Sequence, residues 1–261
     1  MIFSSIEFII FFISFIFLIK IFKNYQKQII ISSSLFFYAY WNPIFIFLII
    51  YLSSVTYLLI KKKINIKFSI LIILLPLFYF KYSFFVFSFI PLEFLNYFSY
   101  KGELPLAISF ITFTAVAILI DIRNRTFNDN LTFINFSEFI LYFPQLIAGP
   151  ILRAKELIPQ LKNKIFFKSE NIKYGIFLFS IGFVKKIFFA DNIALLIDPF
   201  FENPEMFGSV DLIKGILLFP LQIYFDFSGY VDMALGISAF LGIILPINFK
   251  KPYLTYSLTD F

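Results

Sequence analysis

Two aspartates interrupt an apolar stretch late in the chain, and they are its first candidates for chemistry. Asp226 and Asp232 lie within an otherwise apolar run over residues 213–245. An aspartate at the centre of a bilayer costs about 2.5–3.5 kcal/mol on insertion scales. We therefore expect each carboxylate to be paired with a cation, hydrogen-bonded or in contact with water. Carboxylates at that depth are typical of proton and ion paths.

Helical spacing decides whether these two acids face each other. In one continuous helix, Gln222 and Asp226 share a face, whereas Asp232 points about 120° away from Asp226. They are not an obvious catalytic pair. Ser228-Gly229 also favours a helix break, with Asp226 as the new N-cap. In that structural alternative, Gly229 breaks the helix and Asp232 pairs with a basic side chain. Gln222, Asp226, Ser228 and Asp232 are therefore candidates for a substrate path or for structural roles.

The stretch YFPQLIAGPILRA at residues 142–154 is a poor membrane helix. Pro144 removes a backbone donor and clashes with the preceding turn. Gly149-Pro150 repeats the interruption, because a residue before proline is pushed out of the α region. Broken backbone in hydrocarbon is tolerated only where protein covers it or water reaches it. The pattern predicts a broken or re-entrant segment around Pro144 and Pro150, and the alternative is an ordinary proline-kinked span.

Two polar side chains of this stretch, Gln145 and Arg153, are further candidates for a substrate path or a structural role. Residues 153–168 then carry five basic residues and one acid. Their apolar positions recur at helical spacing, which predicts an amphipathic helix on the inner membrane surface, interrupted at Pro159. With a basic loop on each side, the two ends of the broken segment are both expected inside, and this favours re-entry.

Composition places the chain in a membrane. It has 261 residues, 60% of them hydrophobic and 15% charged, with a mean hydropathy of +0.89. A soluble domain has roughly a quarter charged residues. There is no cysteine and no histidine, which excludes disulfides, thiol nucleophiles and thiolate or imidazole metal sites. The net charge of +6 comes from basic residues in short loops, as expected for cytoplasmic loops rather than for nucleic-acid binding.

The apolar runs predict an all-α, polytopic membrane protein of roughly seven to nine helical segments. We expect residues 1–261 to form a single membrane domain in the lipid bilayer. Spans are expected at 2–19, 44–60, 68–90, 105–120 and 172–190. Residues 191–211 are acidic and contain two prolines, so they are interpreted as an outer loop. The last apolar run, 213–245, is expected to be interrupted at Pro220 and again at residues 226–229.

Three stretches, in this order and spacing, resemble the membrane-bound O-acyltransferase family, in its bacterial polysaccharide O-acetylase branch. The likeness covers residues 101–261, which form a family-like core, while residues 1–100 agree only as peripheral hydrophobic spans. The matching residues are Leu104-Pro105-Leu106-Ala107-Ile108-Ser109-Phe110 with Thr112-Phe113 and Ile120-Asp121; Phe143-Pro144-Gln145-Leu146-Ile147-Ala148-Gly149-Pro150 with Arg153-Ala154 and Pro159-Gln160-Leu161; and Gly182 to Lys186, Ala190-Asp191-Asn192, Tyr224 to Ala234, Asn248-Phe249 and Pro252-Tyr253.

The resemblance implies a multi-helix fold around a water-accessible funnel in the bacterial inner (cytoplasmic) membrane. It implies transfer of an acyl group, usually acetyl, to a hydroxyl of a cell-envelope or exported polysaccharide such as alginate. The donor would be acyl-CoA or an acyl carrier protein on the inner side, as a co-substrate, with no bound cofactor. The partner on the outer side would be the glycan acceptor or a partner acetyltransferase.

The chain departs from the family pattern at its histidines. Relatives continue from a sequence like Thr259-Asp260-Phe261 into Trp-Arg-Arg-Trp-His, and later carry a second histidine that is usually taken as the catalytic base. This chain has neither, although a histidine suits removal of the hydroxyl proton. No catalytic residue is assigned, and the chain is expected to be a truncated, inactive fragment by itself.

Two alternatives to that expectation remain open. One is a split enzyme, in which a separate polypeptide supplies the histidines and docks against residues 212–261. The other is an ion-coupled transporter or channel in which Asp226 and Asp232 line the path, since broken helices with acids at mid-depth also suit that class.

Overall fold

The computed structural model describes residues 1–89, 100–127, 131–147, 149, 152–248, 252–255 and 257. These residues are helical or irregular, with no strand among them. The all-α class predicted from the sequence is confirmed.

Contacts divide the chain into two compact units, which are described separately. The first contains Met1, Ile10–Ile147 and Ile151–Lys164, and the second contains Ile2–Ile9, Ala148–Pro150 and Ile165–Phe261. The single membrane domain expected from the sequence stays a prediction.

The first unit contains most of the shorter helices. In chain order they are α1 (Ile6–Ile21, apart from its first turn), α2 (Gln26–Ala39), the 3-10 turn η1 (Pro43–Phe45), α3 (Ile46–Lys61), α4 (Ile66–Leu77), the π-helical turn η2 (Phe78–Tyr82), α5 (Ser83–Ser88), α6 (Ile108–Arg123), α7 (Phe133–Leu141), α8 (Phe143–Leu146) and α9 (Ala154–Leu161).

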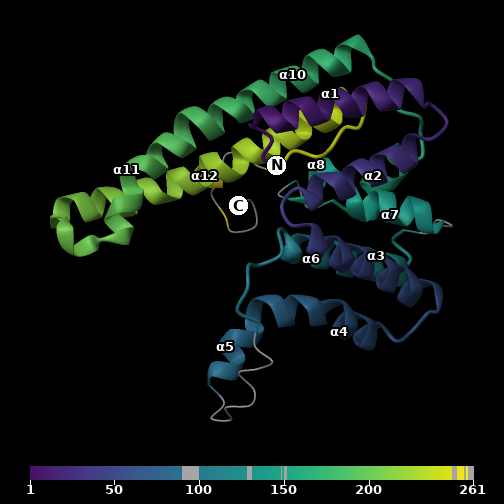
Figure 1. Ribbon diagram of the computed structural model, residues 1–261, viewed down its shortest axis with the longest axis horizontal. Coiled ribbons are helices and arrows are strands. Elements are labelled where there is room, and N and C mark those ends of the chain that lie inside the picture. Colours follow the sequence, from purple (N-terminus) through teal and green to yellow (C-terminus); the bar gives the residue numbers. More distant parts are fainter. Residues whose placement is uncertain are drawn as a thin grey trace. The chain divides into compact units, whose positions relative to one another are not determined.

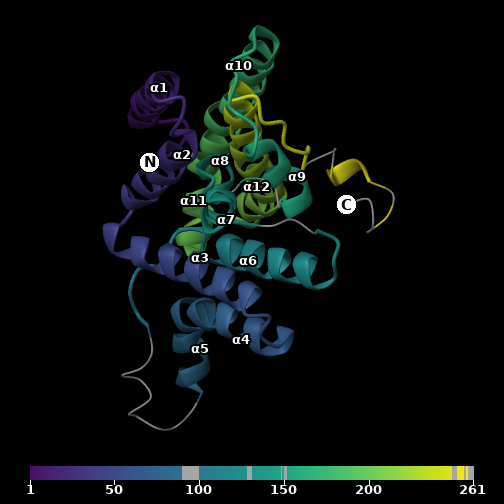
Figure 2. The same ribbon diagram turned by 90° about the vertical axis from the view of Figure 1, so that its right-hand side faces the viewer.

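Packing within this unit is built around α3, α6 and α7. Helix α6 packs on α3 and α4, and α7 packs on α2, α3 and α9; Figure 2 shows α3 and α6 lying side by side. Arg123, in the last turn of α6, donates from Nη2 to the carbonyls of Leu59 and Ile64 at 3.2 and 2.7 Å. Arg123 thereby ties the last turn of α3 and the loop that follows it to α6.

Two helical stretches of this unit are long and apolar enough to cross a membrane by length and composition. The first is Pro43–Lys61, in which η1 continues into α3. The second is Ile66–Phe87, in which α4, η2 and α5 form one continuous helical run. Both correspond to spans expected from the sequence. Pro76 lies inside the second without ending it.

The second unit is dominated by a long helical hairpin. Its first arm joins α10 (Ser169–Val184), the π-helical turn η4 (Lys185–Ala190) and α11 (Asp191–Glu202) without a gap. The short turn η5 (Pro204–Met206) leads into α12 (Ser209–Phe240), which returns antiparallel to the first arm (Figure 1). The first arm and α12 are each about 50 Å long, longer than the roughly 30 Å of hydrocarbon in a bilayer.

Three sequence expectations about this hairpin are wrong. The acidic stretch is largely helical, because α11 continues through Pro199 to Glu202 and leaves a short connection. Helix α12 also runs without interruption through Pro220 and through residues 226–229. A proline within a helix removes one hydrogen bond, and that loss is small beside the packing of two arms along their whole length.

Glycines set how closely the two arms approach. Gly175 and Gly182 are seven residues apart on the first arm, and Gly229 and Gly236 are seven apart on α12. A Cβ added to Gly236 would lie 2.6 Å from both the Gly175 carbonyl oxygen and the backbone nitrogen of Phe179. The backbones therefore touch at two levels, which only glycine permits.

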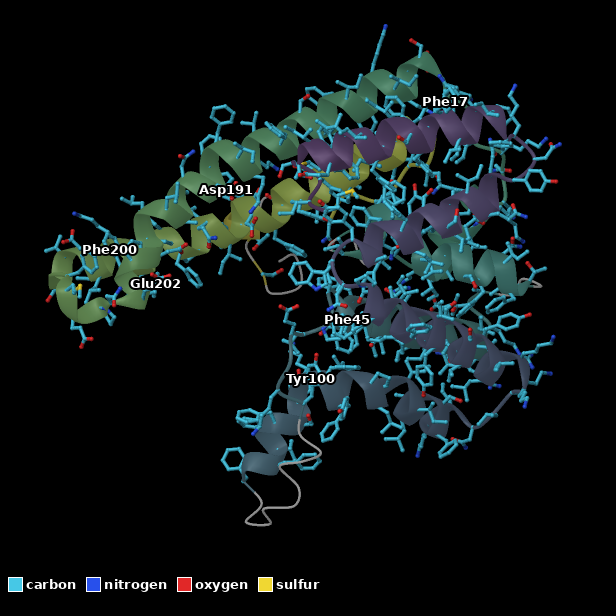
Figure 3. The ribbon with its side chains drawn as sticks, viewed as in Figure 1. Phe17, Phe45, Tyr100, Asp191, Phe200 and Glu202 are labelled. Atoms are coloured by element: carbon cyan, nitrogen blue, oxygen red, sulfur yellow. The ribbon has the colours of Figure 1, made fainter. Side chains whose placement is uncertain are left out.

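Side chains project from both faces of this hairpin, and many of them are large and apolar. In Figure 3, Asp191 lies partway along its length, and Phe200 and Glu202 lie near its far end. Leu195 and Leu217 are 77% and 68% exposed. Such side chains suit a hydrocarbon environment.

Candidate functional site

The two aspartates singled out in the sequence are both engaged by lysines of the neighbouring arm. Lys185 Nζ lies 2.5 Å from Asp232 Oδ2. Lys186 Nζ lies 2.5 Å from Asp226 Oδ1 and 2.9 Å from Asp191 Oδ1. We call these five residues the hairpin clasp. The ion pairs of the clasp offset the free-energy cost of placing carboxylates in an apolar run, because each carboxylate has an ammonium partner.

The spacing of the clasp follows from one glycine contact. Asp226 precedes Gly229 by three residues and Asp232 follows it by three, so the two carboxylates lie on opposite flanks of the line through Gly229. A Cβ on Gly229 would lie 3.0 Å from the backbone nitrogen of Lys186 and 3.1 Å from Cβ of Lys185. The two adjacent lysines therefore straddle α12 at Gly229, and each reaches one flank.

A π-helical turn begins at these lysines. Lys185 opens η4 (Lys185–Ala190), a turn that widens the helix by one residue and is often found at functional sites. In addition to its ion pair, Lys185 lies over the ring of Tyr224, with Nζ 5.9 Å from the ring centroid. The clasp thus joins charge pairing, a helical irregularity and an aromatic contact at one level of the hairpin.

These contacts decide between the structural interpretations of the two acids. Asp232 pairs with a basic side chain, as the structural alternative expected. Asp226 is not a helix cap and Gly229 does not break the helix, so that part of the expectation is wrong. The physical reason is that Gly229 permits close backbone approach to Gly182, and it does so within a continuous helix.

The other two candidates of α12 lie close to the clasp in sequence. Ser228 is 1% exposed, and its hydroxyl oxygen has no hydrogen-bond partner among the described residues. Gln222 is half-buried, one helical turn before Asp226. Tyr253, on the turn η6 (Pro252–Leu254), donates its hydroxyl to the Pro220 carbonyl at 2.7 Å and so holds this turn against α12.

The break predicted near Pro144 is present in the first unit. Helix α7 ends at Leu141, Tyr142 takes an extended ψ of 103°, and α8 begins with Pro144 in its first turn. The amide of Phe143 donates to Ser34 Oγ at 3.2 Å. A protein side chain thus covers part of the broken backbone, as an apolar environment requires.

An aromatic cage holds the residue after the break. The ring of Phe143 is fully buried, and its centroid lies 5.4, 5.2 and 5.7 Å from those of Phe11, Phe15 and Phe37. Edge-to-face contacts of this kind add to the stability gained from apolar burial. The start of α8 is therefore fixed by α1 and α2.

The remaining candidates of the broken segment are placed as follows. Gln145 is 8% exposed, and its Oε1 has no hydrogen-bond partner within the described part of the chain. Gly149 is buried outside any helix. Pro150 lies outside the described residues. Arg153 is exposed, and its backbone amide donates to Glu156 Oε2 at 3.2 Å, at the start of α9.

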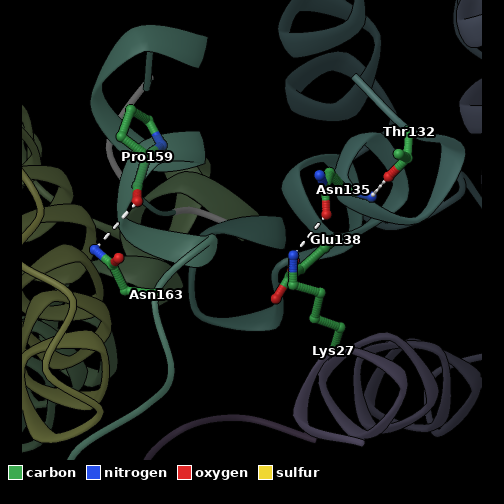
Figure 4. Close-up of polar contacts among 6 residues, drawn as sticks. All are labelled: Lys27, Thr132, Asn135, Glu138, Pro159 and Asn163. Atoms are coloured by element: carbon green, nitrogen blue, oxygen red, sulfur yellow. Dashed lines mark hydrogen bonds and ion pairs between the residues drawn. The ribbon is translucent and has the colours of Figure 1, made fainter. Parts of the chain in front are cut away.

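One buried acid was missed by the sequence interpretation. The Glu138 side chain, on α7, is 1% exposed, and neither of its oxygens has a hydrogen-bond partner among the residues described. Lys27 Nζ is 3.9 Å from Oε2, and it donates to Asn135 Oδ1 at 2.6 Å (Figure 4). The signal that points to it is a single acid within the apolar residues 133–147.

Helix α9 also differs from expectation. Its apolar residues Ala154, Leu157, Ile158 and Leu161 are at most 4% exposed, and the helix packs on α7. The apolar face is thus buried in protein rather than laid on the membrane. The helix is not interrupted at Pro159, which lies inside it.

In the second unit the candidate carboxylates are held in ion pairs, and in the first unit a protein side chain covers part of the broken backbone. Asp226 and Asp232 are occupied by lysines, and Gln145 and Arg153 lie in the other unit. Neither unit, taken by itself, holds a catalytic constellation among its described residues. What the geometry provides is a hairpin of fixed register and a broken segment of fixed position.

The chain is similar to proteins named for the acylation of peptidoglycan, alginate and teichoic acid. The model of the MBOAT, membrane-bound O-acyltransferase family, matches residues 125–261. A peptidoglycan O-acetyltransferase of Helicobacter pylori is 34% identical over 91% of this chain and 52% of its own length. A probable alginate O-acetylase AlgI of Pseudomonas putida is 39% identical over 60% of this chain and 32% of its own.

A more distant relative has a different printed activity. A teichoic acid D-alanyltransferase of Bacillus subtilis is 31% identical over 60% of this chain and 40% of its own length. The chain therefore spans about half the length of the Helicobacter protein and about a third of the length of the Pseudomonas protein. The residues matched by the family include the broken segment and the whole hairpin.

Proposed function

Because the chain belongs to the membrane-bound O-acyltransferase family, we propose that it takes part in moving an acetyl group to a hydroxyl of a cell-envelope or exported polysaccharide. The observation that carries this proposal is the family match over residues 125–261, which contain both the break at Tyr142 and the hairpin clasp. Peptidoglycan is the first acceptor to test, because the relative with that printed activity matches 91% of the chain.

The proposed reaction is an acyl transfer from a thioester. The acceptor hydroxyl oxygen attacks the acyl carbonyl carbon, a C–O bond forms, the C–S bond breaks, and the hydroxyl proton ends on the released thiol. The donor is acyl-CoA or an acyl carrier protein on the inner side of the bacterial cytoplasmic membrane. The acceptor glycan, or an acetyltransferase that relays the group, lies on the outer side.

The base for this reaction is not assigned to the 261 residues. A group that titrates near neutral pH suits removal of the hydroxyl proton, and the chain contains no histidine. Asp226 and Asp232 are engaged by lysines. We propose that these residues by themselves do not transfer an acyl group, and that a histidine from further polypeptide or from a partner completes the site.

Gene deletion tests this proposal. Ester-linked acetyl groups would be released by mild alkali from peptidoglycan, exported polysaccharide and teichoic acid, and then quantified by mass spectrometry. We expect one fraction to lose acetyl on deletion and to regain it with the intact locus. Unchanged acetyl in all three would refute the proposed function. Restoration by residues 1–261 expressed alone would refute their proposed inactivity.

The transporter alternative is less well supported by the clasp. An ion-coupled path requires a carboxylate that exchanges its ligand, whereas both aspartates hold lysines at 2.5 Å. That alternative predicts substrate-coupled flux in reconstituted vesicles and its loss in Asp226→Asn. A split enzyme predicts instead a histidine-bearing membrane protein that co-purifies through residues 212–261.

A further inference from the structure

Helix α9 and the turn after it present a basic surface beside the broken segment. Residues 152–164 contain four basic side chains and one acid. The basic residues are all exposed; they are Arg153, Lys155, Lys162 and Lys164. The acid, Glu156, is half-buried, and it is engaged at the N-terminus of α9, where Oε2 accepts from a backbone amide. The exposed face is therefore strongly cationic.

The geometry of α9 orders this charge. Lys155 and Lys162 are seven residues apart, so they lie two turns apart on one side of the helix. Beyond the last turn, the chain stays tied to the helix, because the Asn163 side chain donates to the Pro159 carbonyl at 3.3 Å (Figure 4). Lys164 therefore follows closely on a fixed turn.

The buried face of α9 excludes one role and favours another. An interfacial amphipathic helix binds lipid by inserting its apolar face, but here that face is covered by the protein itself, with Leu157 fully buried. What remains for a partner is charge. Exposed cations at the start of α9 and just after its end, close in sequence to a broken segment that we expect in the membrane, complement a plane of phosphates at the headgroup level.

We propose that Lys155 on α9, together with Lys162 and Lys164 just after its C-terminus, forms a binding surface for the phosphates of anionic glycerophospholipids. The source of the phosphate is the bilayer, because the charges are spread from the first turn of α9 to the turn that follows the helix rather than gathered around one bound molecule. Such a surface fixes the depth of α9, and through its packing on α7 it fixes the depth of the broken segment. The proposal rests on membrane location and does not depend on acyl transfer.

Native mass spectrometry of the detergent-solubilised protein tests this surface. Phosphatidylglycerol and phosphatidylcholine with identical acyl chains would be titrated at several salt concentrations. Wild-type protein should bind phosphatidylglycerol more tightly, with an affinity that falls as salt rises. The variant Lys155→Gln/Lys162→Gln/Lys164→Gln should lose roughly a hundredfold of that affinity, at about fivefold for each lysine. Binding of phosphatidylcholine should not change.

Two control variants make the outcome specific. Replacement of the same three lysines by arginine keeps the charge and should keep the preference. Lys61→Gln/Lys62→Gln/Lys63→Gln makes the same charge change after α3 and should lose much less. Equal loss in both glutamine variants, or no loss in the α9 variant, would overturn the proposal. Circular dichroism and gel filtration establish that each variant is folded.

A further arm separates the bilayer from the acyl donor as the source of phosphate. Coenzyme A would be added to the wild-type complex with phosphatidylglycerol. We expect no displacement at micromolar coenzyme A. Displacement that disappears in the α9 glutamine variant would assign the surface to a soluble phosphorylated ligand and would refute the lipid proposal.

Discussion

The close approach of the hairpin arms can be tested by adding one methyl group. A Cβ at Gly236 would lie 2.6 Å from two backbone atoms of the first arm, and a Cβ at Gly229 would lie 2.8 and 3.0 Å from two others. Carbon contacts are comfortable at about 3.5 Å or more, so Gly236→Ala forces the arms apart by roughly 1 Å. Neither neighbour is a flexible side chain that can move aside.

The size of the effect follows from two opposing terms. Overpacking of this kind costs about 1–3 kcal/mol, and the constraint at Gly236 favours the upper end. Replacing glycine by alanine within a helix returns about 1 kcal/mol of helix propensity. The net loss for Gly236→Ala is therefore about 1–2 kcal/mol, or a fall in Tm of roughly 2–8 °C. Gly229→Ala should show a smaller fall.

Two other glycines of the same hairpin supply matched controls. A Cβ at Gly215 meets only the side chain of Phe200, at 3.1 Å, and a Cβ at Gly208 meets nothing within 4 Å. Gly215→Ala should be neutral or slightly stabilising through helix propensity. Gly208→Ser supplies a preferred N-cap for α12 and should not destabilise.

Thermal stability of a fluorescent-protein fusion, measured by gel filtration after heating, ranks these variants. The expected order of Tm, from highest to lowest, has Gly215→Ala and Gly208→Ser near wild type, then Gly229→Ala, then Gly236→Ala. If the Tm of Gly236→Ala equals that of the two control variants, the arms do not touch as described, and the seven-residue spacing of the glycines has another cause.

Three further predictions concern polar contacts and use the same assay. Lys185→Asp and Asp232→Lys should each cost about 1–3 kcal/mol, and the double reversal should recover at least half of the summed loss; no recovery would refute the pairing. Lys27→Met should destabilise by about 1–3 kcal/mol because Glu138 keeps no cation, and adding Glu138→Gln should recover most of it; an additive double variant would contradict that link. Tyr253→Phe should cost about 0.5–1.5 kcal/mol through loss of its hydroxyl bond to α12, and an unchanged Tm would show that this bond contributes nothing.

The broken segment was predictable because its cause is local. Pro144 has no amide hydrogen for the carbonyl of Ile140, and its ring clashes with that carbonyl in a continuous helix. An end of α7 shortly before Pro144 can therefore be inferred from the sequence without knowledge of any neighbour. The aromatic cage around Phe143 was not predictable. It brings together residues from α1, α2 and α8, and phenylalanine occurs 43 times in the chain, so its positions carry little information.

Gly229 shows the opposite case, in which local sequence misleads. Asp226 followed by Ser228 and Gly229 is a typical start of a new helix, yet α12 continues through all three. The reason lies 47 residues earlier, at Gly182, whose backbone needs the space that a Cβ on Gly229 would fill. Only the recurrence of glycine at seven-residue intervals on both arms signals this role.

The sequence predicts that Asp226 and Asp232 have basic partners, but it does not predict which lysines these are. Hydrophobic surroundings require a cation for each carboxylate, and the sequence offers many lysines. Lys185 and Lys186 are adjacent, and adjacent residues of an α-helix point about 100° apart, so they do not suggest a pair that grips one helix. The two lysines nevertheless hold α12 between them, because Asp226 and Asp232 lie on either side of the contact at Gly229 and because a π-helical turn begins at Lys185.

The charges of the hairpin clasp bear on whether its aspartates can act as a base. Two lysines face three carboxylates in the clasp, at distances of 2.5–2.9 Å. The carboxylate oxygens that face these lysines are already engaged, so they are not placed to bind an acceptor hydroxyl. The aspartates that first suggested catalysis are therefore better suited to fix the register of two helices than to remove a proton.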